Sequence, residues 1–209
     1  MTSEGETTSG VLLGEPLPIE LMNTVTVDRG HIRDALADEA GATAWLRAVR
    51  DRLAAETGLR PHQLDEASVR SAAGALRALR DTLRRLAAEA TEDPRPPATA
   101  PKLTRPEAIS TLNTLAQAWP ELVWPDAGRP SRRYCGFGTS APLAVQLIAH
   151  QAVELFTGPD RDRLRACLAP NCLLFFVKTV ARREWCSPAC GNRVRVARHY
   201  RRHHAANTG

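Results

Sequence analysis

Four of the five cysteines lie within 24 residues of one another and have the spacing of a metal site. Cys167, Cys172, Cys186 and Cys190 give the pattern C-x4-C-x13-C-x3-C. Zinc favours four thiolates in a tetrahedron at about 2.3 Å, and each close pair can supply two of them from one tight turn. The spacing predicts one structural Zn²⁺, because four protein ligands leave no position open for catalysis. Two alternatives are four buried cysteines without metal and a redox switch that uses the same thiols.

The segment that follows the last of these cysteines is dense in arginine and contains no acidic residue. Residues 160–209 hold eleven Lys/Arg and three acids, a net charge of +8, whereas the whole chain carries +5. A basic end on a near-neutral body is typical of a protein that meets a polyanion. Arginine can offer paired donors to phosphates and to guanine edges. The candidate DNA-binding residues are Lys178, Arg182, Arg183, Arg193, Arg195, Arg198, Arg201 and Arg202, with a merely solvated basic face as the alternative.

The residues around the cysteines predict the elements that hold them. Residues 173–185, between the two pairs, are expected to form a short hairpin that brings the pairs together. Its side chains should alternate, with Leu173, Phe175 and Val177 on one face and Leu174, Phe176 and Lys178 on the other. Ser187 and Pro188 are typical of the N-cap and first position of a helix, which would place Cys190 in its first turn. A knuckle, a hairpin and a helix in this order make a treble clef.

Hydrophobic periodicity upstream of this segment predicts a mainly helical domain with few strands. Helices are expected from about Thr43 to Thr57, from Asp65 to Ala90, over 104–120 and over 141–158, and strands over 121–125 and 131–138. Pro16 and Pro18 argue against a helix and predict a short strand pair or an extended segment near the start of the domain. Residues 28–42 are expected to form a loop, with a short turn of helix over residues 32–40 as the alternative. The arginines of residues 65–90 lie off the apolar stripe of their helix, so we expect them to be solvated.

Composition and missing signals narrow the class of protein. With 43% hydrophobic residues the chain has enough apolar content for a packed core. Residues 1–10 are polar and acidic, unlike a signal peptide, and no apolar run reaches the roughly 18–20 residues of a membrane span. We therefore expect a cytoplasmic protein. No nucleophile elbow or phosphate-binding glycine loop is present, and residues 173–185 lack the histidine that a treble-clef nuclease would need. We expect no enzyme.

Two parts of the chain resemble known families. The motif Cys190-Gly191-Asn192-Arg193, with Trp185-Cys186-Ser187 before it, resembles the CGNR zinc finger. Residues 20–25, Glu-Leu-Met-Asn-Thr-Val, and residues 42–49 are similar to the opening of the ABATE domain, with Met22 where an aromatic residue is common. The resemblance implies an α+β protein. A mainly helical N-terminal domain with a small sheet would bind an unknown ligand, and a C-terminal treble-clef zinc finger would bind DNA.

A domain plan and a function follow from the residues and the resemblance together. Residues 1–10 are expected to be a disordered tail, residues 11–158 the ABATE-like domain and residues 159–205 the zinc finger. Asn23 is the candidate for effector binding, with an asparagine that satisfies a buried turn as the alternative. We expect a transcription regulator that binds double-stranded DNA, responds to a small-molecule effector and forms a homodimer, because one small finger would bind DNA weakly. The alternative is an RNA- or protein-binding adaptor that uses the finger as an interaction module.

Overall fold

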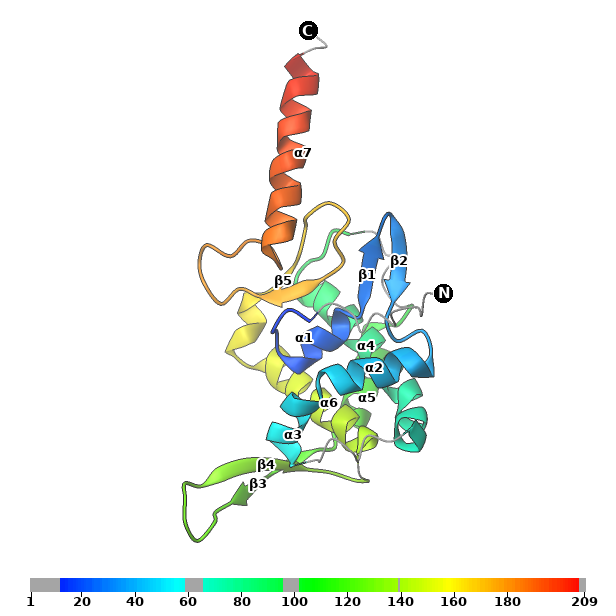
Figure 1. Ribbon diagram of the computed structural model, residues 1–209, viewed down its shortest axis with the longest axis vertical. Helices are drawn as coiled ribbons and strands as arrows, with labels where there is room; N and C mark the ends of the chain where they lie inside the picture. Colours follow the sequence, from blue (N-terminus) through cyan, green and yellow to red (C-terminus); the bar gives the residue numbers. More distant parts are fainter. Residues whose placement is uncertain (1–11, 59–65, 96–101, 139, 207–209) are drawn as a thin grey trace, which may run out of the picture.

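The computed structural model describes residues 12–58, 66–95, 102–138 and 140–206, which form a mixed α+β structure (Figure 1). This described part contains seven α-helices and three two-stranded antiparallel sheets. The helices other than α7 pack into one body. A β-hairpin extends from one end of that body, and the C-terminal helix α7 extends from the other (Figure 1). The predicted fold class is confirmed, whereas the tail predicted for residues 1–10 falls outside the described residues.

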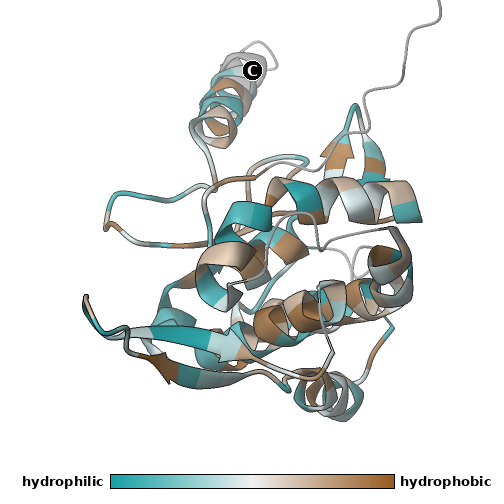
Figure 2. Ribbon diagram, turned by 60° about the horizontal axis from the view of Figure 1, so that its bottom comes forward, coloured by the Kyte–Doolittle hydropathy of each residue, from teal (hydrophilic) through white to brown (hydrophobic). Residues whose placement is uncertain are grey.

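Three helices form the centre of the body: α4 (Glu66–Ala90), α5 (Arg105–Leu115) and α6 (Ala141–Thr157). The predicted stripe of α4 is buried, with Leu76 and Leu83 fully enclosed. Helix α6 buries apolar residues around most of its circumference, as expected for a helix covered on several sides. The hydrophobic residues accordingly line the inside of the helical body (Figure 2).

The segment from α5 to the projecting hairpin follows the sequence prediction with one shift. Thr104 caps α5, and Glu107 reaches back to complete the capping box. The helix ends at Leu115, several residues before the predicted stop at Pro120. Pro120 instead lies in the first strand of the hairpin, which consists of β3 (Trp119–Val123) and β4 (Ser131–Cys135) paired antiparallel. Each of these strands has an unpaired edge within the described structure, where a proline costs no ladder hydrogen bond.

The predicted extended segment around Pro16 and Pro18 is wrong. A short helix, α1 (Leu17–Met22), occupies this position, and all six of its residues are buried. Pro16 is the N-cap residue and Pro18 lies in the first turn, where the backbone N–H groups have no intrahelical acceptor. A proline there removes no helical hydrogen bond, so two prolines open this helix instead of preventing it.

The loop predicted for residues 28–42 is also wrong. Strands β1 (Val25–Asp28) and β2 (His31–Asp34) form a hairpin, and α2 (Glu39–Ala48) begins four residues before the expected cap at Thr43. The cap is Asp38, whose carboxylate accepts a hydrogen bond from the Gly41 N–H. The helix then breaks near Val49, and α3 (Arg50–Thr57) continues to the predicted stop at Gly58, which adopts the left-handed conformation.

Two arginines of α4 contradict the prediction of a solvated face. Arg80 and Arg84 are 5% and 4% exposed. Arg80 forms ion pairs with Asp34 and with Asp81, whereas the guanidinium of Arg84 donates to the carbonyl oxygen of Met22 at 2.8 Å. Burial lowers the pKa of Arg84 to about 10, which still leaves it charged at neutral pH. These arginines therefore hold the interior together.

The C-terminal segment consists of a 3-10 turn, a two-stranded sheet and a long helix. These are η3 (Pro159–Arg163), β5 (Leu164–Ala166), β6 (Phe175–Val177) and α7 (Pro188–Ala206). The hairpin predicted between the two cysteine pairs is wrong in place, because β6 pairs with β5, which precedes the first cysteine. The predicted alternation is confirmed for residues 174–177. Phe175 and Val177 enter the core of the helical body, and Leu174 and Phe176 enter a smaller core around the cysteines.

Candidate metal centre and basic helix

The four clustered cysteines bring their sulfur atoms to one buried point. All four Sγ atoms lie within 4.8 Å of one another, and none of the cysteines forms a disulfide. The Sγ atom of Cys172 is 3.7 Å from those of Cys186 and Cys190, which are 3.4 Å apart. A tetrahedron with Zn–S bonds of about 2.3 Å has edges of about 3.8 Å. The cluster can therefore hold one zinc ion, as the spacing predicts.

The electrostatics of the thiols also fit a site that needs a cation. Hydrogen bonds from Cys172 and Cys186 favour the thiolate of Cys167 and lower the pKa of Cys167 to about 2. The same interaction with Cys167 raises the pKa of Cys172 to about 12 and also raises the pKa of Cys186. Like charges this close cannot all ionise by themselves. A divalent metal supplies the positive charge that four neighbouring thiolates require.

Three of the four residues of the Cys190–Arg193 motif have a visible task beside this cluster. Cys190 lies in the first turn of α7, where its backbone N–H donates to the capping hydroxyl of Ser187 at 3.3 Å. A side chain at Gly191 would begin 3.2 Å from the Trp185 ring, so glycine lets the ring pack on the helix. Arg193 donates to the Cys190 Sγ at 2.8 Å, and this hydrogen bond raises the pKa of Arg193. Arg193 thus supports a thiolate of the cluster.

The helical body reaches into the metal centre through Arg95. Its Nη1 atom lies 3.1 Å from the carbonyl oxygen of Cys172 and 3.3 Å from that of Leu174. Asp93 holds the guanidinium in place at 2.6 Å, and the group lies 4.7 Å from the centre of the Phe175 ring. The first cysteine turn is therefore fixed by a side chain that precedes it by more than seventy residues. Sequence patterns gave no signal for this contact.

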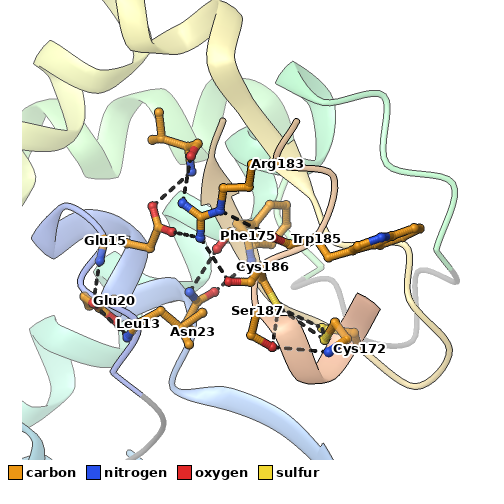
Figure 3. A network of polar contacts seen from close by, with 12 residues as sticks. Leu13, Glu15, Glu20, Asn23, Cys172, Phe175, Arg183, Trp185, Cys186 and Ser187 are labelled. Atoms are coloured by element: carbon orange, nitrogen blue, oxygen red, sulfur yellow. Dashed lines mark hydrogen bonds and ion pairs between the residues drawn. The ribbon is translucent and has the colours of Figure 1, made fainter. Parts of the chain in front are cut away.

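A second contact joins the start of the helical body to the other cysteine turn (Figure 3). Glu15 is 3% exposed and pairs with Arg183, which also donates to the carbonyl oxygen of Cys186 at 2.9 Å. The other carboxylate oxygen of Glu15 accepts from the backbone N–H of Val177 at 3.0 Å. Nearby, the carboxylate of Glu20 accepts from the backbone N–H groups of Leu13 and Glu15. The structure thus assigns Arg183 an internal partner.

Asn23, the predicted effector contact, is fully buried and uses its side-chain amide on one backbone position. Its Oδ1 atom accepts from the Phe175 N–H at 2.8 Å, and its Nδ2 atom donates to the Phe175 carbonyl at 3.0 Å (Figure 3). The residue has no exposed surface. This geometry agrees with the alternative of a structural asparagine, although the group it satisfies lies in β6 and not in a local turn. Asn23 therefore fastens α1 to the metal-bearing segment.

The remaining candidate DNA-binding residues lie mainly on the exposed part of α7. Beyond Val194, none of the described side chains up to Arg202 is buried. Arg195, Arg198 and Arg202 follow an i, i+3, i+7 spacing and share one face of the helix. The remaining candidates are Arg182 and Arg201, which are exposed, and Lys178, which is half-buried. The structure brings a basic surface to the end of the molecule that carries the cysteine cluster, and each assignment as a DNA contact stays a prediction.

Comparison with known families gives one match for each of the two parts of the chain. Residues 15–159 match the family ABATE, described as "Putative stress-induced transcription regulator", and residues 163–203 match the CGNR zinc finger. Neither description is that of an enzyme family. A search among curated proteins gave no match. None of the described helices is both long enough and apolar enough to cross a membrane.

Proposed function

This chain belongs to the ABATE family and carries a CGNR zinc finger, and from that premise we propose that it binds double-stranded DNA through α7. The zinc-bound cysteines hold the first turn of the helix, and the exposed arginines contact the phosphate backbone. The helical body transmits a signal, from a small-molecule effector or from dimerisation, to the finger. The proposal places this activity in the cytoplasm.

The observation that carries this proposal is the free-standing basic helix. Helix α7 has 19 residues, about 28 Å in length. Its Cys190 and Val194 pack into the cysteine core, and beyond them the helix extends away from the rest of the molecule (Figure 1). No acid follows Glu184 in the sequence, whereas a helix that merely faces water usually mixes charges of both signs. A helix about 10–12 Å wide fits the major groove, which is about 12 Å wide.

The surroundings of the basic residues support a division into two groups with different tasks. Arg183 and Arg193 are held by Glu15 and by a cysteine sulfur, so they position the finger. Arg195, Arg198 and Arg202 are exposed, so phosphates can reach them. In this proposal the first group sets the angle of α7 and the second supplies most of the affinity.

Contacts between the finger and the body support the signalling part of the proposal. Asn23, Arg95 and Glu15 each bind backbone or side-chain groups of the metal-bearing segment. A change in the body that moves α1 would therefore move the cysteine turns. Because the amide of Asn23 is already used, we propose that an effector acts elsewhere on the body.

The alternative of a single-stranded RNA adaptor receives less support from the structure. Recognition of unpaired bases relies on exposed aromatic rings that stack on them. Phe175 and Phe176 are each 1% exposed, so neither ring can stack on a base. Tyr200, on α7, is 62% exposed and can be reached by one. A duplex, whose phosphates can be bound without stacking, suits this helix better.

The test is the salt dependence of binding to duplex DNA, measured by fluorescence anisotropy with the zinc-loaded chain. Each phosphate contact adds about 0.9 to the slope of log K against log salt. Changing Arg195 and Arg198 to Ala should lower that slope by about 1.8. The matched control changes two exposed arginines of the body, Arg33 and Arg50, and should leave the slope unchanged. A salt-independent affinity, or stronger binding to single-stranded RNA of equal length, would overturn the proposal.

A further inference from the structure

The β3–β4 hairpin exposes large hydrophobic side chains that the fold does not use. Leu122 is 72% exposed and Trp124 is 68% exposed. Near the base of the hairpin Phe137 is 65% exposed, and its ring meets the ring of Trp119 edge-on at 5.4 Å. Single exposed apolar residues are ordinary, but several on one projecting element mark an interaction surface. The hairpin stands out from the helical body on the side away from α7 (Figure 1).

The register of the two strands shows which way the apolar side chains face. Tyr134, opposite Pro120, is 1% exposed and turns towards the body, where its hydroxyl lies 3.4 Å from a carboxylate oxygen of Glu154. Side chains two residues apart share a face of a strand. Leu122 and its partner Arg132 therefore lie on the same face as Tyr134, farther from the body. That face is therefore the one on which Tyr134 meets Glu154 of α6.

The surface beside the hairpin is a hollow with acidic edges. It has a volume of about 570 Å³ and lies between α1, α3 and α6. Leu17, Ala55 and Leu155 contribute apolar lining, and the carboxylates are Glu56, Glu154 and Asp160. Its one arginine, Arg52, is held by Glu20 and by the carbonyl oxygen of Glu15. The hollow therefore presents apolar lining and negative charge. It lies close to the hairpin, because its Glu154 contacts Tyr134.

We propose that the hairpin docks into this hollow on a second copy of the same chain. The outer hairpin, residues 122–132, carries Arg129 and Arg132 against one acid, Asp126, so its charge complements that of the hollow. A twofold dimer needs one surface that is complementary to itself, and here the projecting element and the receiving element lie side by side. A twofold axis beside the hairpin base places each Trp124 and Leu122 over the partner's hollow. Arg132 then faces Glu56 across the interface.

This dimer extends the proposed function without depending on it. A standard interface buries about 800 Å² per partner, and aromatic side chains of about 150–250 Å² each supply a large share. Each contact occurs twice about a twofold axis, so two hairpins double the apolar area. The basic helices lie at the far ends of the two bodies, which leaves them exposed in the dimer (Figure 1). Two fingers per particle would also raise the affinity for DNA.

The experiment is sedimentation velocity on the zinc-loaded full chain without DNA, over a series of concentrations. We expect a monomer–dimer equilibrium, and the paired change Leu122→Ser with Trp124→Ser should raise the dimer Kd at least tenfold. The matched control is Ile32→Ser on the β1–β2 hairpin, where the side chain is 53% exposed, and it should leave the Kd unchanged. Circular dichroism checks that each variant is folded.

Charge reversal identifies the partner surface. Arg132→Glu and Glu56→Arg should each weaken the dimer severalfold, and the two changes in one chain should restore it, because the attraction is re-formed with its sign exchanged. A wild-type chain that stays monomeric at every concentration overturns the proposal. So does an equal effect of Ile32→Ser, or a folded double-reversal variant that does not recover. Since no DNA is present, these outcomes are independent of the DNA-binding test.

Discussion

Replacing Asn23 with Ala should destabilise the whole protein although the substitution removes few atoms. The Asn23 amide satisfies both the N–H and the carbonyl of Phe175 at a completely buried position. Alanine removes both hydrogen-bond partners at a site without solvent exposure, so two backbone groups lose their hydrogen bonds. Leaving a buried polar group unpaired costs about 1–3 kcal/mol. We expect a loss of about 2–4 kcal/mol in the free energy of unfolding.

Urea denaturation followed by circular dichroism measures this loss, and thermal denaturation gives a second value. For a chain of this size, 3 kcal/mol corresponds to a decrease in Tm of about 6–12 °C. Hydrogen exchange should locate the damage, with faster exchange at the β6 amides and at the neighbouring cysteine turns. The effect would reach the metal centre because Asn23 fastens the segment that carries the first two cysteines.

The matched control is Asn192→Ala, since the Asn192 side chain accepts from Arg195 at an exposed position on α7. Exposed substitutions of this kind usually change stability by less than about 0.5 kcal/mol. If Asn23→Ala proved as mild as this control, the amide would not fasten Phe175. The reasoning that assigns Asn23 a structural role would then be refuted, and a ligand-binding role would regain support.

Three further predictions concern the metal centre, a buried arginine and pH. Cys167→Ser should abolish retention of zinc in a chromogenic chelator assay, whereas Cys135→Ser, outside the cluster, should retain it. Arg84→Met should lower the free energy of unfolding by about 2–4 kcal/mol in urea denaturation, because the buried carbonyls that Arg84 contacts lose a charged donor. A loss below about 0.5 kcal/mol, which is typical of exposed sites, would contradict this. Burial raises the pKa of Glu20 above its ordinary 4.5, so the folded state holds that proton to a higher pH than the unfolded chain does. The free energy of unfolding therefore falls as the pH rises from the ordinary pKa to the raised one. Glu20→Gln should remove that part of the pH dependence, and equal slopes for the two proteins in denaturation between about pH 4 and 7 would disprove it.

The metal centre could be predicted from sequence because its determinants are local. Two pairs of cysteines in tight turns, with Ser187 and Pro188 inside the second pair, fix the ligands and the start of α7 within a short stretch of chain. The apolar stripes of α4 and α6 and the stop at Gly58 are local in the same way. Each depends on spacing along the chain or on one residue's backbone preference.

The remaining features depend on contacts between distant residues. Pro18 argues against a helix by composition, but its place in the first turn of α1 makes it harmless. The sequence predicts Arg84 as a solvated charge, but Met22 of α1 and Leu173, just before β6, offer it carbonyl oxygens. Arg95 and Asn23 bind backbone groups, which carry no residue signature in the sequence. These failures are concentrated at the junction between the helical body and the finger.

One family of variants would test the junction as a unit. The guanidinium groups of Arg95 and Arg84 lie 4.7 and 5.5 Å from the centre of the Phe175 ring. Asn23 fixes the backbone of the same residue. Contacts that share a partner are coupled, so substitutions here should be non-additive in stability, unlike substitutions on α7. Through these coupled contacts, a structural change in the helical body would reach the finger.

The most direct test of the account is DNA binding by the same preparation with and without its metal. Purified protein should contain one zinc per chain, bind duplex DNA, lose that binding when a chelator removes the zinc and regain it on addition of one equivalent of Zn²⁺. Metal analysis and anisotropy on matched aliquots give both quantities. A metal-free chain that keeps an ordered α7 and binds DNA equally well would contradict the claim that zinc-bound cysteines hold an arginine-rich helix for DNA.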